Sequence, residues 1–315
     1  MSLEVLYHQL RDEITKVVFG QDEVVDLVLA ALFSSGHVLL EGPPGTAKTL
    51  LARTVAAAVR LEYRRVQMTP DLLPIDITGS SIYREEQRSF EFRKGPIFTN
   101  FLLADEINRA SARTQSALLE AMQELQVTYD GVTHHLPQPF LTFATQNPIE
   151  HEGTYPLPLA QLDRFMFKVI VTYPAAADEE KVLREHHATG GMSDPRQMNV
   201  QAVVGPEDLL QARQTIRATN IREEVIGYVR RLLHATRGDD SLAVGSSPRS
   251  GLMLLMAAKS LARFAGRDFV IPDDIKAAFI PVMRHRVVLS PSAELEGTST
   301  DAVLNYLLES VEVPR

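Results

Sequence analysis

The glycine-rich segment GPPGTAKT, residues 42–49, carries the strongest chemical signal in the sequence. It lies directly after an apolar run and directly before an apolar helical pattern, which is the strand–loop–helix context that a phosphate-binding loop requires. Glycines let the backbone curl so that several N–H groups point at the phosphates, and the helix N-terminus adds the positive end of its dipole. We expect Lys48 to reach the β- and γ-phosphates and the Thr49 hydroxyl to hold Mg²⁺.

One position of this segment departs from the usual pattern, because Ala47 stands where a second glycine is common. A Cβ atom at that position is tolerated if the backbone is already helical there. The alternative interpretation of the whole segment, a Gly/Pro turn that precedes a helix by chance, is disfavoured by the length of the motif and by its context.

A second signal is the apolar run FLLADE, residues 101–106, which ends in two acids. Ligands of open α/β sheets sit at the carboxyl ends of the strands. We therefore expect Asp105 to hold Mg²⁺, directly or through water, and Glu106 to orient and polarise the attacking water. Alone, such an acidic pair can equally be a solvated helix start, but about 60 residues after a phosphate loop it becomes a strong signal.

A third segment, ATQNP at residues 144–148, follows another apolar run. The amide of Asn147 can hydrogen-bond the attacking water and the γ-phosphate if its strand lies next to that of Asp105. Taken by itself, an asparagine that opens a turn before a proline is the simpler interpretation.

Short apolar runs predict the strands that must position these groups. The five runs are His37–Leu40, Tyr63–Gln67, Phe101–Ala104, Leu141–Ala144 and Phe167–Val171. Helical patterns separate most of them, and this alternation predicts an α/β fold whose parallel sheet is covered by helices on both faces.

Two segments are extra to such a fold, and we predict that both are inserted hairpins. One spans residues 80–93, and the other spans residues 127–136 with Asp130-Gly131 at its turn. The regular pattern then fades into a linker after residue 190, and the segments beyond it look helical. We therefore predict a nucleotide-binding domain over residues 1–190, followed by a linker and an all-helical domain over residues 191–315.

The composition limits the remaining function classes. The chain has 315 residues and a net charge of −8, which makes it a poor non-specific binder of nucleic acid. It has no cysteine, so disulfides, thiolate metal sites and cysteine nucleophiles are excluded. Its first residues lack a secretory h-region, and no run approaches the roughly 18 apolar residues of a membrane span. A cytoplasmic protein without a membrane span is the expectation.

Taken together, five motifs resemble those of AAA+ ATPases. They are Gly20-Gln21, GPPGTAKT, LLADEINRA, ATQNP and PLAQLDRF. The DEINRA and QLDRF forms, with a hairpin inserted before the acidic strand, resemble the MoxR family in particular. The resemblance covers nearly the whole chain, from Val18 to the C-terminal helices.

The resemblance implies a P-loop AAA+ core and a C-terminal all-helical lid, with ATP bound between them. It also implies a ring of identical subunits, commonly a hexamer, that hydrolyses Mg-ATP with ATP and Mg²⁺ as its bound cofactors. Members of the family act as chaperones on a protein client, in maturation or in metal-cofactor insertion. They usually work with a partner that carries a von Willebrand factor A domain.

Family roles carry over to the matching positions. Asn147 takes the place of sensor 1, Arg164 matches the arginine finger that reaches the neighbouring subunit's γ-phosphate, and Arg249 matches the sensor-2 arginine. Arg109 is a candidate for a further interface contact. Arginine suits these roles because its planar, permanently charged fork pairs with phosphate oxygens. The predicted nucleotide-binding residues are Gly20, Gln21, Gly42, Pro43, Pro44, Gly45, Thr46, Ala47, Lys48, Thr49, Leu50 and Asp105.

Two other functions compete with this prediction. A nucleic-acid-dependent AAA+ motor is one, because helicase relatives share the inserted hairpins, but the acidic net charge, the absence of tryptophan and the mixed-sign hairpins disfavour it. A scaffold that binds nucleotide with little turnover is the other. The presence of Lys48, Asp105, Glu106, Asn147 and Arg164 disfavours the scaffold.

Overall fold

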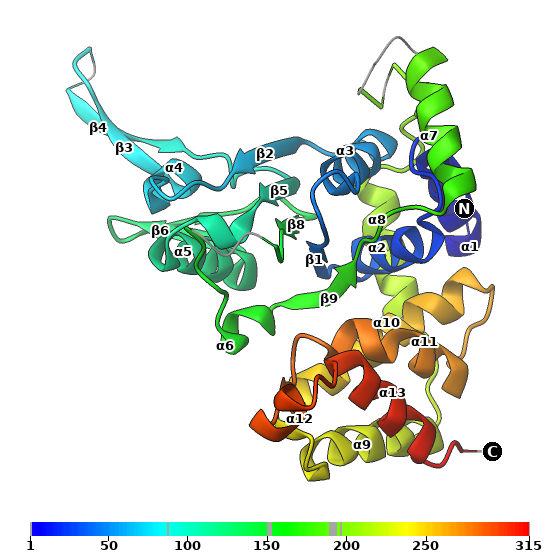
Figure 1. The fold of residues 1–315 in the computed structure, drawn as a ribbon. Coiled ribbons are helices and arrows are strands. Elements are labelled where there is room, and N and C mark those ends of the chain that lie inside the picture. Colours follow the sequence, from blue (N-terminus) through cyan, green and yellow to red (C-terminus); the bar gives the residue numbers. More distant parts are fainter. Residues whose placement is uncertain (1, 87, 150–152, 189–193, 196, 315) are drawn as a thin grey trace.

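The computed structural model describes residues 2–86, 88–149, 153–188, 194–195 and 197–314 (Figure 1). Its centre is a five-stranded sheet with the order β2-β5-β8-β1-β9, in which all neighbouring strands are parallel. The strands are β1 (His37–Glu41), β2 (Tyr63–Gln67), β5 (Phe101–Asp105), β8 (Leu141–Gln146) and β9 (Phe165–Ile170). All five predicted strands are confirmed, with ends that differ by no more than two residues.

Alternating residues of the strands explain why both faces of the sheet are covered. Successive side chains of a strand point to opposite faces. Leu39 and Leu102 pack with α5 on one face, whereas Leu40 and Leu103 belong to the core that the N-terminal helices and α3 complete. The helices involved are α1 (Leu3–Thr15), α2 (Asp22–Ser34), α3 (Lys48–Ala58) and α5 (Ala112–Glu124).

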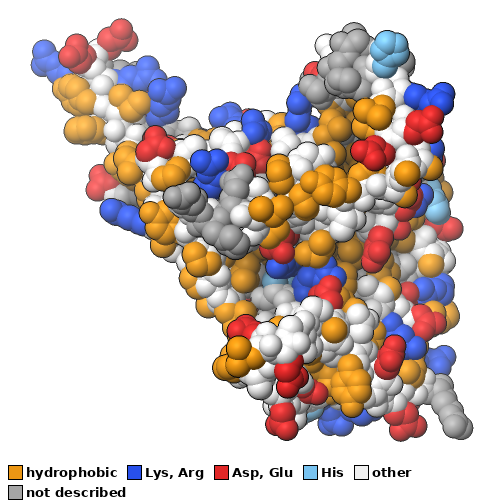
Figure 2. Space-filling view, viewed as in Figure 1, with side chains coloured by type: hydrophobic (Ala, Val, Ile, Leu, Met, Phe, Trp, Pro, Cys, Tyr) orange, Lys and Arg blue, Asp and Glu red, His pale blue; other side chains and the backbone are white. Residues whose placement is uncertain are grey.

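Both predicted hairpins are present. The first projects from the body of the molecule at the upper left of Figure 1, and hydrophobic, acidic and basic side chains gather on it (Figure 2). Its Phe92 ring stacks on His134 of the second hairpin, with the ring centroids 4.1 Å apart, so the two hairpins touch. Their strands are β3 (Gly79–Arg84) with β4 (Ser89–Lys94), and β6 (Gln126–Tyr129) with β7 (Val132–His135); α4 (Pro74–Thr78) precedes the first.

The C-terminal domain is built mainly of helices, and several of them begin with a proline, which is favoured at the first helical position. It also contains a short antiparallel ladder of β10 (Leu242–Val244) and β11 (Val288–Leu289), so it is not entirely helical. The remaining helices are α6 (Leu159–Leu162), α7 (Ala176–Ala188), α8 (Pro206–Arg217), α9 (Glu223–Gly238), α10 (Pro248–Phe264), α11 (Pro272–Met283), α12 (Pro291–Leu295) and α13 (Thr300–Ser310), and a 3-10 turn spans Ile107–Arg109.

A buried arginine fixes this domain against the sheet. Arg286, which follows α11, is 3% exposed and places its Nε atom 2.7 Å from the Asp163 carboxylate. It also donates hydrogen bonds to the carbonyls of Phe165 and Met166 at the start of β9. The C-terminal helices are therefore anchored where β9 begins, at the amino edge of the sheet. Within the described ranges, no helix combines the length and the apolar character needed to cross a bilayer.

Candidate active site

The loop after β1 forms the predicted phosphate cradle. It joins the carboxyl end of β1 to α3, whose first residue is Lys48. Gly42 lies so close to the carbonyl of Val171 that a Cβ atom would clash with it, which explains the glycine there. The cavity next to the loop has a volume of about 330 Å³ and is lined by Pro44, Gly45, Thr46, Ala47, Lys48, Thr49, Leu50, Arg65, Gln67, Asp105, Glu106, Thr145, Gln146 and Asn147.

Ala47 does not begin the helix in right-handed conformation. Its φ of 62° and ψ of 20° lie in the left-handed region, which costs a residue with a Cβ atom about 1–2 kcal/mol. The prediction that an alanine is tolerated at this position because the backbone is already in the right-handed helical conformation is therefore wrong. Strain of this kind persists where the surrounding structure fixes it, and it gathers at ligand-binding loops.

The Lys48 ammonium lies inside the loop. Its Nζ atom donates hydrogen bonds to the carbonyls of Gly42 at 2.6 Å and Pro43 at 2.7 Å. Burial lowers the pKa of Lys48, while the nearby carboxylates of Asp105 and Glu106 act in the opposite direction. A cation held among backbone carbonyls in this way can exchange them for phosphate oxygens without leaving the loop.

Asp105 ends β5 beside the loop and is surrounded by donors. Its carboxylate accepts hydrogen bonds from Thr49 at 3.2 Å and from Thr145 at 2.5 Å. The guanidinium of Arg65 donates to the same carboxylate at 2.7 and 2.9 Å. The side chain of Asp105 is only 8% exposed, so this pairing compensates a buried charge.

Glu106 follows directly and has a second set of partners. Its carboxylate accepts a hydrogen bond from Gln67 at 2.6 Å and lies 3.2 Å from the guanidinium of Arg109. Its backbone has a φ of 59°, which is a strained conformation for a non-glycine residue. Arg109, the candidate for a further interface contact, is thus paired with Glu106 of its own chain.

Four residues that line this cavity were not predicted from the sequence: Arg65, Gln67, Thr145 and Gln146. Arg65 and Gln67 are two residues apart on β2, so they share one face of this edge strand, and they lie opposite Leu103 and Asp105 of β5. The alternation in YRRVQ was the available signal, because polar residues two apart at the end of an edge strand share one side of it.

The donor set suits a hard cation. The Thr49 hydroxyl and the Asp105 carboxylate lie within 3.2 Å of each other at the mouth of the phosphate loop, and both offer oxygen atoms. Mg²⁺ prefers such ligands and keeps the rest of its shell from water and phosphates. Within the described residues, no cluster of three or more His, Asp or Glu side chains offers an alternative metal site.

Of the other residues predicted at this edge, one lines the cavity and two do not. Asn147 lines the cavity and accepts a hydrogen bond from the Ile149 backbone N–H. Gly20 and Gln21 are not among its lining residues. Gln21 donates to the carbonyl of Thr172, which follows the Val171 that lies against Gly42, so Gln21 lies near the loop, whereas Gly20 lies against Asp178 of α7.

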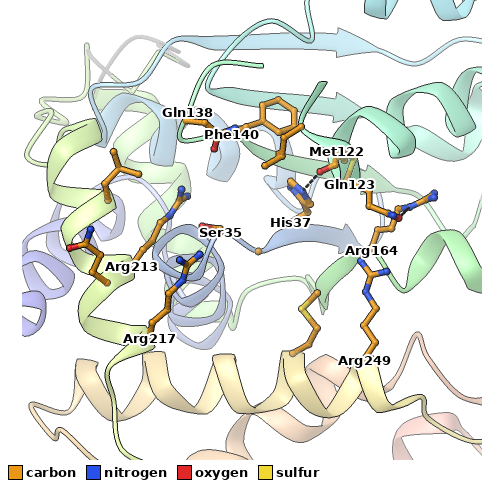
Figure 3. Close-up of a pocket in the computed structure, with 15 residues that line it drawn as sticks. Ser35, His37, Met122, Gln123, Gln138, Phe140, Arg164, Arg213, Arg217 and Arg249 are labelled. Atoms are coloured by element: carbon orange, nitrogen blue, oxygen red, sulfur yellow. Dashed lines mark hydrogen bonds between the residues drawn. The ribbon is translucent and has the colours of Figure 1, made fainter. Parts of the chain in front are cut away.

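Arg164 and Arg249 lie away from the loop, at the opposite edge of the sheet. They share a cavity of about 500 Å³ whose wall includes Ser35, Gly36 and His37, the residues at the amino end of β1 (Figure 3). Arg164 donates to Gln123, and Arg249 lies 3.9 Å from Asp163. No residue of α8 to α13 lines the loop cavity. Arg286 anchors the C-terminal helices at the other edge, so they form no wall of this cavity, and the placement of ATP between core and lid stays a prediction.

Comparisons with known proteins identify the family of this chain. Residues 37–167 match the ATPase family associated with various cellular activities (AAA), and residues 234–306 match the AAA lid domain. The chain is 44% identical over 312 residues to "Chaperone MoxR1" of Mycobacterium tuberculosis, covering 96% of this chain and 81% of that protein. It is 33% identical over 321 residues to "Protein MoxR" of Paracoccus denitrificans, covering 95% and 93%. The crystal structure of a candidate ATPase from Cytophaga hutchinsonii superposes with a TM-score of 0.89 at 41% identity, covering 99% of this chain and 97% of that one.

Proposed function

Because this chain belongs to the MoxR family of AAA+ ATPases, we propose that it hydrolyses Mg-ATP at sites shared between neighbouring copies of a ring. The observation that carries this proposal is the separation of the site residues. Lys48, Asp105 and Glu106 lie at the carboxyl edge of the sheet, whereas Arg164 and Arg249 lie at its amino edge. A single chain can thus bind a triphosphate, but its own Arg164 lies on the wrong side to reach that nucleotide.

The residues of one chain divide the work. The N–H groups of the phosphate loop and Lys48 bind the phosphates, and Thr49 and Asp105 hold Mg²⁺, which supplies positive charge to the phosphate oxygens when bound. Glu106 orients the attacking water and takes up its proton, and the amide of Asn147 is close enough to the same cavity to position that water. Arg164 and Arg249 stabilise the developing negative charge on the nucleotide of the next copy.

The client-facing part of the proposal rests on the hairpins. Phe90 is 74% exposed and Tyr83 is 51% exposed on the projecting hairpin, where neither contributes to the core of the nucleotide domain. Exposed aromatic side chains on a projection offer a surface for another protein. We infer that the ring uses these hairpins to remodel a protein client in maturation or metal-cofactor insertion, together with a partner that carries a von Willebrand factor A domain.

The shared site is tested by mixing two inactive variants. Arg164→Ala is expected to keep its ATP affinity and to lose about 10³ to 10⁵ in turnover, the usual contribution of an arginine supplied in trans. Lys48→Ala loses ATP binding but keeps its arginine. Mixed rings should recover part of the activity, since Lys48→Ala subunits can donate Arg164 to Arg164→Ala neighbours.

Phosphate release is measured for each variant and for the mixture, with co-assembly shown by pull-down of differently tagged chains. Arg230→Ala, an exposed substitution on α9, is the control for loss of one positive charge. A mixture that co-assembles but stays as inactive as its components would mean that Arg164 does not act between subunits.

The role of the hairpins is tested separately. Deleting the tip residues Asp130 and Gly131 should leave ATP affinity and basal turnover unchanged, because neither residue lines the loop cavity. The deletion should reduce the proteins that co-purify with the tagged chain. Loss of nucleotide binding in a folded deletion variant would show that the hairpin serves the fold instead.

A further inference from the structure

The cavity at the amino edge of the sheet is rich in arginine. Its lining includes Arg164, Arg213, Arg217 and Arg249, and no Asp or Glu is among the described residues that line it. Arg213 and Arg217 come from α8 on one side, Arg164 and Arg249 lie on the other, and His37 lies between them (Figure 3). A cavity with four cations in its wall and no anion attracts negatively charged ligands.

Arg213 is the buried arginine of this cavity, and no acid among the described residues is paired with it. It is only 8% exposed, and its Nε atom has no hydrogen-bond partner. One of its terminal nitrogens reaches the carbonyl of Leu32, at a long 3.4 Å. Burial, with a smaller contribution from Arg217, lowers the pKa of Arg213 to about 10, so the side chain stays charged at neutral pH. A buried cation without an acid is costly, and an anion in the cavity removes that cost.

The neighbouring groups do not supply the missing negative charge. Arg164 contacts the neutral amide of Gln123. Asp163 lies 3.9 Å from Arg249 but is already paired with Arg286 at 2.7 Å. His37 accepts a hydrogen bond from the Thr142 N–H through Nδ1, which fixes it as a neutral imidazole.

We propose that this cavity binds a phosphate-bearing anion through Arg213 and Arg217, at the edge of the sheet opposite the chain's own phosphate loop. The planar fork of arginine matches the oxygens of a phosphate group, and the arginines on two sides of a 500 Å³ cavity suit more than one phosphate. Two sources share this chemistry: a free nucleotide or phosphate, and the nucleotide bound to a neighbouring copy. The inference goes beyond the proposed function, because it gives Arg213 and Arg217, which that function does not use, a role in holding phosphate; where the anion is the neighbour's nucleotide, it rests on the proposed function.

The first experiment asks whether a free anion binds. In Lys48→Ala the phosphate loop is disabled, and inorganic pyrophosphate is titrated into this variant by calorimetry. We expect one binding event per chain, weakened at least 10-fold in Lys48→Ala/Arg213→Met. Arg230→Met in the same background removes one positive charge from an exposed position on α9 and should change nothing.

A melting experiment separates a ligand site from a structural arginine. Pyrophosphate should raise the Tm of Lys48→Ala but not that of Lys48→Ala/Arg213→Met. Without pyrophosphate, Arg213→Met should not lower the Tm, because the substitution removes a buried charge that has no acid partner. Arg217→Met, at an exposed position, repeats the binding test with no risk to the core.

A third arm identifies the source. Glu106→Gln chains loaded with a fluorescent ATP analogue are mixed with Lys48→Ala chains, with or without Arg213→Met. Faster release of the analogue when the partner carries Arg213→Met assigns the anion to the neighbour's nucleotide, and Arg213-dependent pyrophosphate binding to Lys48→Ala alone assigns it to a free anion. If Lys48→Ala binds no pyrophosphate and the release rate ignores Arg213, the proposal is overturned.

Discussion

The carboxyl edge and the amino edge of the central sheet both carry charged side chains, but these side chains are paired within the chain at only one of the two edges. At the carboxyl edge, Asp105 is paired with Arg65 and Glu106 lies against Arg109 and Gln67. At the amino edge, four arginines face a cavity without any carboxylate among its described lining residues.

This difference shows at which edge the charges are compensated within one chain. The carboxyl edge pairs its acids with cations of the same chain, and in the proposed function these internal partners are exchanged for Mg²⁺ and phosphate. The amino edge has an excess of positive charge that its own chain does not compensate. Under the proposal of a shared site, the compensating negative charge comes from the nucleotide of a neighbouring copy.

After the loss expected for Arg164→Ala, the largest expected effect comes from the carboxyl edge. Glu106→Gln should keep ATP affinity and lower turnover by about 10² to 10⁴, the range for loss of a general base. Lys48→Ala should instead lose ATP affinity, because it removes the charge that contacts the phosphates. Calorimetry and phosphate release measure the two effects, with Glu120→Gln on the exposed face of α5 as control. Parental turnover in Glu106→Gln would remove this residue from the site.

The amino edge should show a smaller effect through Arg249. Loss of one charged hydrogen bond, about 1.5–3 kcal/mol, corresponds to a fall in turnover of about 10-fold to 100-fold for Arg249→Ala. Because Arg249 lies beside Arg164, mixing with Lys48→Ala should restore part of the turnover. If mixing restores no turnover to Arg249→Ala while it rescues Arg164→Ala in the same assay, Arg249 does not act on the neighbour's nucleotide. The division of the site residues between the two edges would then not hold for Arg249.

Internal pairing at the carboxyl edge is tested by Arg65→Met. The substitution leaves the buried Asp105 without its cation, and we expect the free energy of unfolding to fall by about 1–3 kcal/mol without nucleotide. The adjacent Arg64→Met breaks an exposed pair with Glu62 and should cost about 0–1 kcal/mol. Chemical denaturation of both variants gives the comparison, and equal losses would mean that Arg65 does not compensate Asp105.

The smallest effect concerns His37 at the amino edge. Burial lowers its pKa from 6.5 to about 4. Between these values only the unfolded chain binds the proton, so the stability that His37 contributes is present above pH 6.5 and is lost as the pH falls. When the pH falls from about 7 to about 5, the free energy of unfolding should decrease in both proteins. The decrease should be smaller in His37→Gln than in the parent, by about 1–2 kcal/mol.

Denaturation curves at the two pH values measure this difference. The exposed His8→Gln serves as the control, and it should follow the parent. A parental pH dependence in His37→Gln would mean that the imidazole is protonated in the folded chain, which would add a further positive charge to the cavity.

Several features could be predicted from the sequence because they are local in the chain. The phosphate loop needs only a strand, a few glycines and a helix that follow one another, and all three occur between His37 and Ala58. The carboxyl ends of all strands in a parallel sheet lie at one edge, so Asp105 at the end of β5 and Glu106 after it had to approach the loop. The two hairpins could also be predicted, because their turn residues and their alternating pattern lie within a few positions of each other in the chain.

Other features were decided only by the tertiary structure, because they depend on residues far apart in the chain. Nothing near Arg249 in sequence indicates that Arg286 pairs with Asp163 and holds the C-terminal helices at the amino edge. The pairing of Arg65 with Asp105 arises only when an edge strand docks beside β5. The excess charge around Arg213 likewise appears only when α8, β1 and α10 enclose one cavity. Sequence patterns specify which groups a segment carries, whereas packing between distant segments decides which charges are buried together and which are left without a partner.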